Sequence, residues 1–346
     1  MRFILLIVLM FTALAAGRRL SIEESKFIAF QNKYNKIYSA DEYLVKFETF
    51  KSNLLNIDAL NKKAASLKSD TKFGVNKFAD LSKEEFRKSY LNGKPAIMTE
   101  DLPKFPELSD DIVSVTPTAF DWRTKGAVTP VKNQGQCGSC WSFSTTGNVE
   151  GQHYLAGNTL VGLSEQNLVD CDHDCMTYDN QNVCNAGCDG GLQPNAYSYI
   201  IKNGGIDFES TYPYTAVDGE CKFNPANVGA KITSYAMVPQ NETQIAAYLY
   251  QHGPLAIAAD AEEWQFYIGG VFDLPCGQSL DHGILIVGFS AQNTIVGKNT
   301  PYWIVKNSWG EDWGEQGYLK VERGDNKCGV SDFVSSSIIS ASSSSN

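Results

Sequence analysis

The sequence is poor in histidine, poor in positive charge, and free of cysteine before Cys137. Only four of its 346 residues are His, and 29 Lys and Arg stand against 39 Asp and Glu, which gives a formal net charge of −10. Contacts with phosphate need clustered Lys and Arg. We therefore expect no nucleic-acid partner, and disulfides only in the part of the chain that begins near Cys137.

Long apolar runs are also missing, apart from one at the N-terminus. Arg2 is followed by the apolar residues 3–16, and Ala13-Leu14-Ala15 has the small residues of a cleavage site. An uncleaved anchor is the alternative, but about 14 apolar residues are too few for a bilayer that needs about 20. The sequence therefore predicts a secretory signal peptide over residues 1–17, no membrane association, and a lysosomal or secreted destination.

The nine cysteines lie between Cys137 and Cys328. In an exported protein they are expected to form disulfides, and an odd number leaves one thiol that is either reactive or intermolecular. The alternative is a zinc site, which we consider weaker because exported cysteines usually oxidise. Its ligands would come from Cys171, His173, Cys175, Cys184 and Cys188.

Charge divides the rest of the chain in two. Residues 18–115 hold 17 Lys and Arg against 15 Asp and Glu, whereas residues 116–346 hold 11 against 24. Four prolines fall within residues 92–117, where there is little apolar periodicity. This stretch is expected to be a linker of the kind that proteases cut.

The first part of the chain has a mainly helical pattern. Apolar residues at spacings of three and four predict helix over residues 22–66. Asn53 and Asn61 lie on the same face as the apolar series, which suggests ordered polar contacts rather than plain core. A short strand is expected over Gly74–Asp80, and a capping box beginning at Ser82 predicts a short helix.

The second part changes from helical to strand patterns along its length. Helices are expected to begin near Ser139, Ser164, Leu192 and Asn241. Strands are expected over Leu255–Ala259, Gly283–Phe289, Tyr302–Val305 and Tyr318–Val321. This order predicts an α+β fold of two subdomains with a cleft between them. Residues 335–346 are mostly Ser and are expected to form a frayed tail.

The stretch Gln134–Trp141 holds the sharpest chemical pattern, with cysteines at 137 and 140. A redox or zinc pair is disfavoured, because there is no thioredoxin-like context and no second pair at zinc-finger spacing. A helix that begins near Ser139 would place the sulfur of Cys140 at its positive end, which favours the reactive thiolate. Cys140 is therefore the candidate nucleophile.

A thiolate nucleophile needs a base, and His282 is the best placed of the four histidines because it stands at the entrance to an apolar strand. The others are expected on the surface, namely His153, His173 and His252. Asn307 follows another strand, and its amide oxygen can accept the imidazole N–H and orient the ring. Trp309 could shield that hydrogen bond from water.

These residues resemble the papain family of cysteine peptidases. The motif Cys137-Gly138-Ser139-Cys140-Trp141 is typical of the family, with a histidine and an asparagine far downstream. Here His282 follows Cys140 by 142 residues and Asn307 by 167. The second spacing is long for the family, which predicts an insertion near residues 290–300. Residues 121–130 look like the start of a mature enzyme of this family.

The first part resembles the inhibitory pro-segment of cathepsin L-like precursors. The long-helix motif would be Glu42, Lys46, Phe50, Asn53, Ile57 and Asn61, with Lys46 where Arg is usual. A second motif would be Gly74, Asn76, Phe78 and Asp80. The resemblance implies a helical inhibitory pro-segment over residues 18–115. It also implies a papain-like peptidase domain over 116–346, with a helical half, a β-barrel-like half and a Ser-rich tail.

The resemblance also implies roles for single residues. Gln134 and the backbone N–H of Cys140 would donate to an oxyanion. Gly190 and Gly191 would pair with an extended substrate, and Trp309 would border the cleft. The main specificity pocket would be lined by Leu192, Gln193, Ala258, Leu280, Gly283 and Phe333. The implied disulfides are Cys137–Cys188, Cys171–Cys221 and Cys276–Cys328, with Cys175–Cys184 in an insertion like that of some cathepsin F-like enzymes.

The implied function is a cysteine endopeptidase made as an inactive precursor, in which the pro-segment is an intramolecular inhibitor. We expect protein and peptide substrates, a monomer, and no cofactor or metal. An inactive papain-fold binding protein is disfavoured because Cys140, His282 and Asn307 are all present. An inhibitor built from the pro-segment alone, or a transglutaminase-like acyl transferase, is a further alternative. Asn241-Glu242-Thr243 is a glycosylation sequon.

Overall fold

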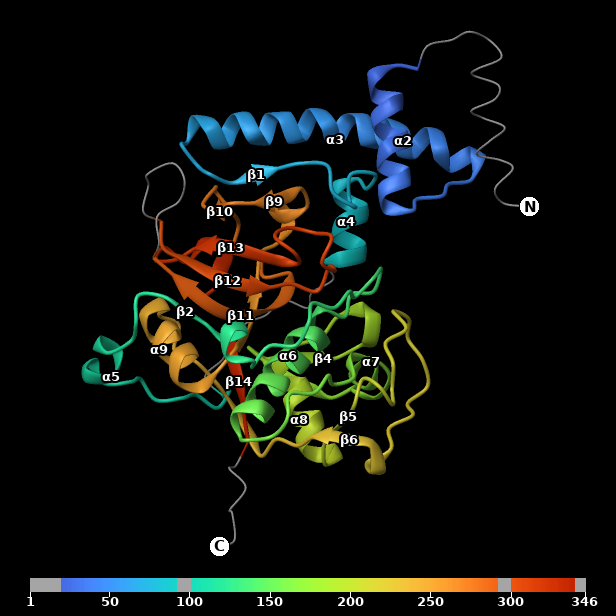
Figure 1. Cartoon of the computed structure of the whole chain (residues 1–346). Coiled ribbons are helices and arrows are strands. Elements are labelled where there is room, and N and C mark those ends of the chain that lie inside the picture. The colour runs from blue at the N-terminus through green and yellow to red at the C-terminus, as the bar shows by residue number, and fades with distance from the viewer. Residues whose placement is uncertain (1–19, 92–100, 292–299, 340–346) are drawn as a thin grey trace, which may run out of the picture.

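The structure, a computed structural model, describes residues 20–91, 101–291 and 300–339. The predicted signal peptide lies outside these ranges, and so does most of the predicted insertion near residues 290–300. We call residues 20–91 the arm, residues 101–119 the linker and residues 120–339 the body. Figure 1 shows the arm lying across one end of the body.

The arm consists of α2 (Ile22–Tyr34), α3 (Ala40–Ser66), β1 (Lys72–Phe73) and α4 (Lys83–Tyr90). Each helix begins at a serine whose side chain accepts from the backbone of a glutamate three positions on, and the glutamate caps in return. Such capping boxes satisfy N–H groups that a helix start leaves unpaired. The helix predicted over 22–66 is interrupted at Asn35, whose left-handed φ of 52° ends α2.

Two asparagines of α3 hold the chain that follows it. The Asn53 side-chain amide donates to the carbonyls of Ala79 and Leu81, at 2.9 Å each. Asn61 donates to the carbonyl of Phe73 at 2.9 Å and accepts from its N–H at 3.1 Å. The polar contacts predicted for this helix face are therefore confirmed.

The strand predicted over Gly74–Asp80 was wrong. The regular strand is only β1, which pairs antiparallel with β9 (Tyr267–Gly269) of the body. Beyond it the Asn76 side chain accepts from the N–H of Phe78 at 3.0 Å and donates to the carbonyl of Gln265 at 2.7 Å. Side-chain bonds of this kind turn the backbone and replace ladder hydrogen bonds.

The helical half of the body is built around α6 (Cys140–Leu155), which is buried from Cys140 to Gly151. Its other elements are α7 (Glu165–Cys171), β3 (Cys175–Tyr178), β4 (Gln181–Cys184), α8 (Gln193–Asn203), β5 (Ile206–Asp207) and β6 (Val228–Ala230). The helix starts predicted near Ser139, Ser164 and Leu192 are confirmed. Figure 1 shows these helices below the strands formed by residues 282–290, 302–306 and 318–322 of the other half.

The strand half is one mixed sheet in the order β10-β13-β12-β11-β8-β14-β7, with β2 also paired to β11. The order shows an open sheet, so the β-barrel-like description was too strong. The members are β2 (Phe120–Asp121), β7 (Ser234–Met237), β8 (Leu255–Ala259), β10 (Val271–Phe272), β11 (His282–Ser290), β12 (Tyr302–Lys306), β13 (Tyr318–Glu322) and β14 (Val334–Ile338). The four strands predicted from Pro254 onward are confirmed. Helix α9 (Glu242–His252) packs against β11, and α5 (Asp110–Ser114) of the linker packs against α9.

The predicted frayed tail is wrong for its first residues, because β14 is buried between β7 and β8. Asn148 of α6 explains why Ser337 is tolerated there. Its side-chain oxygen accepts from both the N–H and the hydroxyl of Ser337, at 2.8 Å each. Small hydroxyl side chains fit a buried strand when their hydrogen bonds are satisfied.

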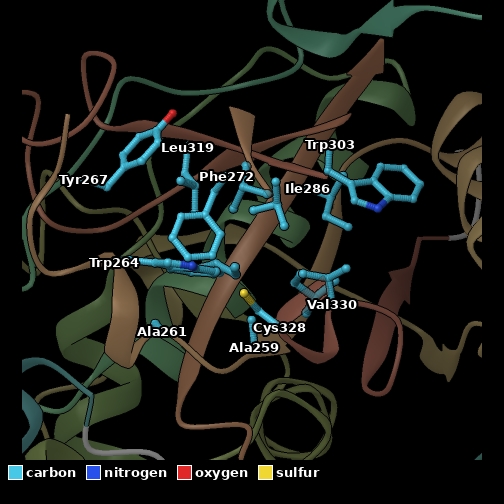
Figure 2. Close-up of a cluster of buried hydrophobic side chains, with 14 of the residues drawn as sticks. Ala259, Ala261, Trp264, Tyr267, Phe272, Ile286, Trp303, Leu319, Cys328 and Val330 are labelled. Atoms are coloured by element: carbon cyan, nitrogen blue, oxygen red, sulfur yellow. The ribbon is translucent and has the colours of Figure 1, made fainter. Parts of the chain in front are cut away.

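The main apolar core lies over the strand half, and Figure 2 shows part of it around Trp264, Phe272 and Trp303. The same cluster includes residues of the arm, namely Ile57, Ala64, Phe73, Phe78, Leu81, Phe86, Tyr90 and Leu91. The arm is thus packed into the core of the body rather than tethered beside it. Among the helices of the described ranges, none has the length and apolarity needed to cross a bilayer.

Candidate active site

Cys140 is the first residue of α6, and its side chain lies at the interface of the two halves. All nine cysteines fall within the described residues, and Cys140 is the one that forms no disulfide. Burial raises the pKa of its thiol to about 11, while the backbone N–H groups of Gly283, Trp141 and Cys140 act in the opposite direction. These donors and the helix end would stabilise a thiolate that has a positive partner nearby.

His282 begins β11, and its Nε2 lies 2.7 Å from the side-chain oxygen of Asn307, which follows β12. The adjacent pairing of β11 and β12 fixes this distance. Since the Asn oxygen only accepts, Nε2 is the nitrogen that donates, and in a neutral ring Nδ1 then carries the lone pair. Nδ1 is buried without a hydrogen-bond partner among the described residues. Burial lowers the pKa of His282 to about 4.

Trp309 covers the histidine. Its ring stacks on the His282 imidazole with centroids 4.7 Å apart and planes 28° apart. On its other sides it meets Phe78 and Phe86 of the arm edge-on, at 5.5 and 5.3 Å. The hydrogen bond between His282 and Asn307 is therefore held in a dry environment, where it is stronger than in water.

Gln134 is fully buried, and its side-chain amide has a fixed orientation. The Ser308 hydroxyl donates to its Oε1 at 2.6 Å, which directs Nε2 the other way. Nε2 donates to the carbonyl of Cys137 at 3.0 Å and to the carbonyl of Tyr90, at the end of α4, at 3.3 Å. The donor expected to serve an oxyanion is thus bonded to the arm. Sequence reasoning gave no signal for Tyr90 or Ser308 in this place.

Gly190 and Gly191, which the resemblance implies would pair with an extended substrate, follow the short helix Gly187–Asp189. Gly190 has φ of 97°, a conformation that L side chains rarely adopt. A Cβ on Gly191 would come within 2.7 Å of the Trp141 ring and 2.5 Å of the Asn185 side chain. A larger residue would strain the backbone at Gly190 and would have to displace the Asn185 or Trp141 side chain at Gly191.

The expected specificity pocket is an apolar cluster that contains Leu192, Ala258 and Phe333, with Leu280 packed against it. The structure adds members that the sequence did not indicate, namely Leu102, Tyr178, Val183 and Met237. Leu102 belongs to the linker and is only 4% exposed. A side chain of the precursor itself therefore fills this cluster.

Two other residues expected in the pocket have different surroundings. The Gln193 amide points away from the apolar cluster, since its Nε2 donates to the Ser144 hydroxyl and the Ile257 carbonyl, both at 3.0 Å. Gly283 lies against the start of α6, where a Cβ would meet the Cys140 carbonyl at 3.1 Å. Gly283 therefore permits the close approach of β11 to the nucleophile's helix.

The disulfide pairing agrees with the one that the resemblance implied. The bonds are Cys137–Cys188, Cys171–Cys221, Cys175–Cys184 and Cys276–Cys328. The cysteines of the alternative zinc site are all used in these bonds. Cys175 and Cys184 join β3 to β4, a hairpin whose Tyr178 and Val183 are buried in the pocket cluster.

The fold and this site define a cysteine peptidase in its precursor form, and the chain belongs to the papain family. Residues 116–338 match the Papain family cysteine protease, and residues 27–86 match the Cathepsin propeptide inhibitor domain. The pro-segment is thus an intramolecular inhibitor, and the protein is a zymogen.

Similar proteins extend over almost the whole chain. Cysteine proteinase 1 of Dictyostelium discoideum is 66% identical over 98% of this chain and 100% of its own length. Cysteine proteinase 1 of Zea mays is 46% identical over 90% of this chain and 85% of its own length. The solved structure of digestive procathepsin L 3 from Tenebrio molitor larval midgut has a TM-score of 0.80 at 38% identity, covering 92% of this chain and 100% of that one.

Proposed function

We propose that the protein is an endopeptidase that cuts proteins through a Cys140 thiolate and a His282 imidazolium. The observation that carries this is the buried Nδ1 of His282, which has no hydrogen-bond partner among the described residues and whose Nε2 is held by Asn307 at 2.7 Å. The next residue, Gly283, directs its backbone N–H at the free Cys140 thiol. A ring oriented in this way can accept the thiol proton at Nδ1. Although burial disfavours each charge alone, the two opposite charges form together and stabilise one another.

The proposed reaction has two halves. The Cys140 sulfur attacks the scissile carbonyl, and the oxyanion accepts hydrogen bonds from Gln134 Nε2 and the Cys140 N–H. The C–N bond then breaks, His282 gives its proton to the leaving amine, and an acyl-enzyme remains. Water, deprotonated by His282, attacks this thioester, and the carboxylic acid product leaves as the sulfur recovers its proton.

This proposal is tested by hydrolysis of short peptides over a range of pH, with and without a thiol-alkylating reagent. We expect turnover by the processed chain, and complete loss of turnover after alkylation. Activity that survives full alkylation would contradict the thiolate mechanism.

Activation would require the arm to leave the body, and charges at their contact support release by acid. Lys83 of the arm lies 3.0 Å from Glu262 and 3.4 Å from Glu263, and Lys77 lies 3.1 Å from Asp312. Within the arm, Lys46 on α3 bonds Glu85 on α4 at 2.7 Å. Burial acts to raise the pKa of Glu85, but hydrogen bonds from Lys46 and the Ser82 N–H outweigh it, so the pKa lies below its ordinary value.

We expect acid to open the precursor. Glu85, whose pKa is depressed, stabilises the packing of α4 on α3 within the arm at pH values above its ordinary pKa, and that stabilisation is lost as the pH falls below it. Release of the arm should therefore begin as the pH falls below about 4.5, the ordinary pKa of a glutamate carboxyl. Incubation of the precursor over a pH series, followed by N-terminal sequencing, should show a new start near Thr116. Full activity of the uncut precursor at neutral pH, or a terminus within residues 125–140, would contradict this expectation.

Substrate choice should follow the pocket cluster that contains Leu102. Among the described residues, the side chains that pack with Leu102 in that cluster are apolar, so a basic side chain there would lie against apolar groups. We expect substrates with Leu or Val before the residue at the scissile bond to be cut at least about tenfold faster than those with Arg. A peptide-library profile measures this directly. A profile led by Arg would contradict it.

We also propose that the protein enters the secretory pathway, acts in a lysosome or outside the cell, and is a monomer. Asn241 supports glycosylation during export, because it is exposed at the start of α9. Its Oδ1 accepts from the N–H groups of Thr243 and Gln244. A glycan on the side-chain nitrogen would leave this cap in place. Glycosidase treatment of the exported protein, read by mass spectrometry, tests the assignment.

A further inference from the structure

We propose that the mature enzyme carries a second peptide-binding surface beyond the specificity pocket, for an extended substrate segment with an aromatic side chain. It consists of the Met237 backbone, at the end of β7, together with Gln244, Tyr248 and His252 of α9. We call it the α9 surface. In the precursor it holds linker residues 103–108. The inference rests on the proposed function, because the linker must leave for the surface to become available.

The first component binds main chain rather than side chains. The Met237 N–H donates to the carbonyl of Pro103 at 2.7 Å, and its carbonyl accepts from the N–H of Phe105 at 2.9 Å. The Gln244 side-chain amide binds the backbone of the linker at Leu108. It accepts from the Leu108 N–H at 2.8 Å and donates to the Leu108 carbonyl at 3.0 Å. Contacts to backbone groups are available to any extended sequence.

The second component is an aromatic slot. The Phe105 ring lies 5.1 Å from that of Tyr248 and 6.1 Å from that of His252. Tyr248 and His252 stack on each other at 5.3 Å, and the Tyr248 hydroxyl donates to the carbonyl of Pro106. Phe105 is also packed against the main core cluster. The slot therefore selects a side chain, while Met237 and Gln244 hold the chain around it.

The α9 surface continues from the specificity pocket. Leu102 is buried in the pocket cluster together with Met237, whose backbone then holds the next linker residues. Figure 1 shows that the linker passes α9 on its way to α5, well apart from the arm. Met237, Gln244, Tyr248 and His252 all belong to the body, so the surface persists when the linker is cut away near Thr116.

The occupant we assign is the part of the substrate that lies N-terminal to the residue held in the pocket, away from the scissile bond. In the precursor the aromatic residue follows the pocket residue by three positions, from Leu102 to Phe105. Lys104 of the linker is bridged to Met237 in parallel, and the same N–H and carbonyl of Met237 can also pair antiparallel with a chain that runs the other way. A substrate with an aromatic residue a few positions N-terminal to its pocket residue should therefore bind more tightly than one without it.

The test uses the full chain, processed by its own activation, and a set of fluorogenic peptides with one cleavage core. The N-terminal extensions carry a single Phe at each of the three to five positions before the pocket residue, or Ala throughout. The best Phe position should lower KM by about two- to tenfold, with kcat unchanged. Equal KM for Phe and Ala at every position would overturn the proposal.

The double variant Gln244→Ala, His252→Ala should abolish this gain and leave the unextended core peptide unaffected. Gln251→Ala, an exposed residue of the same helix, is the matched control and should keep the gain. A gain that persists in the double variant would refute the assigned surface.

A binding measurement separates this inference from the proposed function. A labelled peptide of residues 103–110 should bind the processed chain by fluorescence anisotropy, and the same peptide with Phe105→Ala should bind less tightly by about two- to tenfold. This readout needs no turnover, so it remains decisive even if the core peptide is not cut. Equal binding of the two peptides, or no binding by either, would contradict the proposed α9 surface and leave the proposed function untouched.

Discussion

Replacement of Cys140 by Ser is expected to lower kcat/KM by about 10⁴-fold or more, because removal of a nucleophile leaves only binding and oxyanion contacts. Oxygen and sulfur side chains are nearly the same size, and no disulfide uses this sulfur. The precursor should therefore fold with its four disulfides intact. Peptide hydrolysis after acid treatment measures the loss, and circular dichroism reports the fold.

The double variant Cys175→Ser, Cys184→Ser is the matched control, since it makes the same substitution away from the nucleophile. Loss of a short-loop disulfide should cost at most about 2–3 kcal/mol of stability in the chain-entropy model. Activity toward a short peptide should be largely kept. Mass spectrometry of alkylated native enzyme should find the label on Cys140. Turnover by Cys140→Ser, or a label on Cys137, would overturn the assignment of the nucleophile.

Phe78→Ala is expected to remove the latency of the precursor at neutral pH. The Phe78 ring is 1% exposed and lies 4.6 Å from Tyr90 and 5.5 Å from Trp309. It thus joins the arm to the residue that covers His282 and to the residue whose carbonyl engages Gln134. Truncation of a buried Phe costs about 3–5 kcal/mol. If most of this falls on arm docking, the open form becomes roughly 10²- to 10³-fold more populated.

The measurement is hydrolysis of a short peptide at neutral pH by precursor that gel electrophoresis shows to be uncut. Leu55→Ala on α3 is the control, because Leu55 is 74% exposed and its loss leaves the docking contacts in place. This control should remain as latent as the unchanged chain. A fully latent Phe78→Ala precursor would show that Phe78 does not hold the arm on the site.

The Phe78 ring also explains why acid should not be the whole of the switch. The docking ion pairs of Lys83 are on the surface, where single pairs contribute about 0–1 kcal/mol. The aromatic contacts with Trp309 do not titrate in acid. We therefore expect acid to raise the frequency of opening, and cleavage of the linker to make the opening permanent.

Much of the candidate catalytic centre was predictable because its residues lie in short sequence motifs or next to predicted strands. Cys140 lies in a short motif at a helix start, and His282 stands at the entrance to a predicted strand. Asn307 follows another strand, and neighbouring antiparallel strands bring it within 2.7 Å of His282. Local patterns of this kind survive in the sequence because they depend on spacing along the chain.

The two secondary-structure predictions that the structure contradicts failed for a different reason. Gly74–Asp80 was read as a strand because its side chains alternate, but Asn76 bonds the distant Gln265 and turns the chain. Residues 335–338 were read as a tail because serine is polar, but Asn148 satisfies Ser337 within the buried β14. In both cases a partner far along the chain overrode the local preference.

The sequence by itself determined the family resemblance, the division into pro-segment and peptidase, the candidates for nucleophile and base, and the disulfide pairing that the resemblance implied. Only the tertiary structure showed where the precursor places its own residues: the Tyr90 carbonyl at Gln134, Leu102 in the apolar cluster with Leu192 and Phe333, and Phe105 against Tyr248 and His252. The hydrogen bond of Tyr90 and the ring contacts of Phe105 alone join residues from 44 to 147 positions apart. No periodicity or motif encodes them, because they arise from the packing of surfaces that exist only once each half has folded.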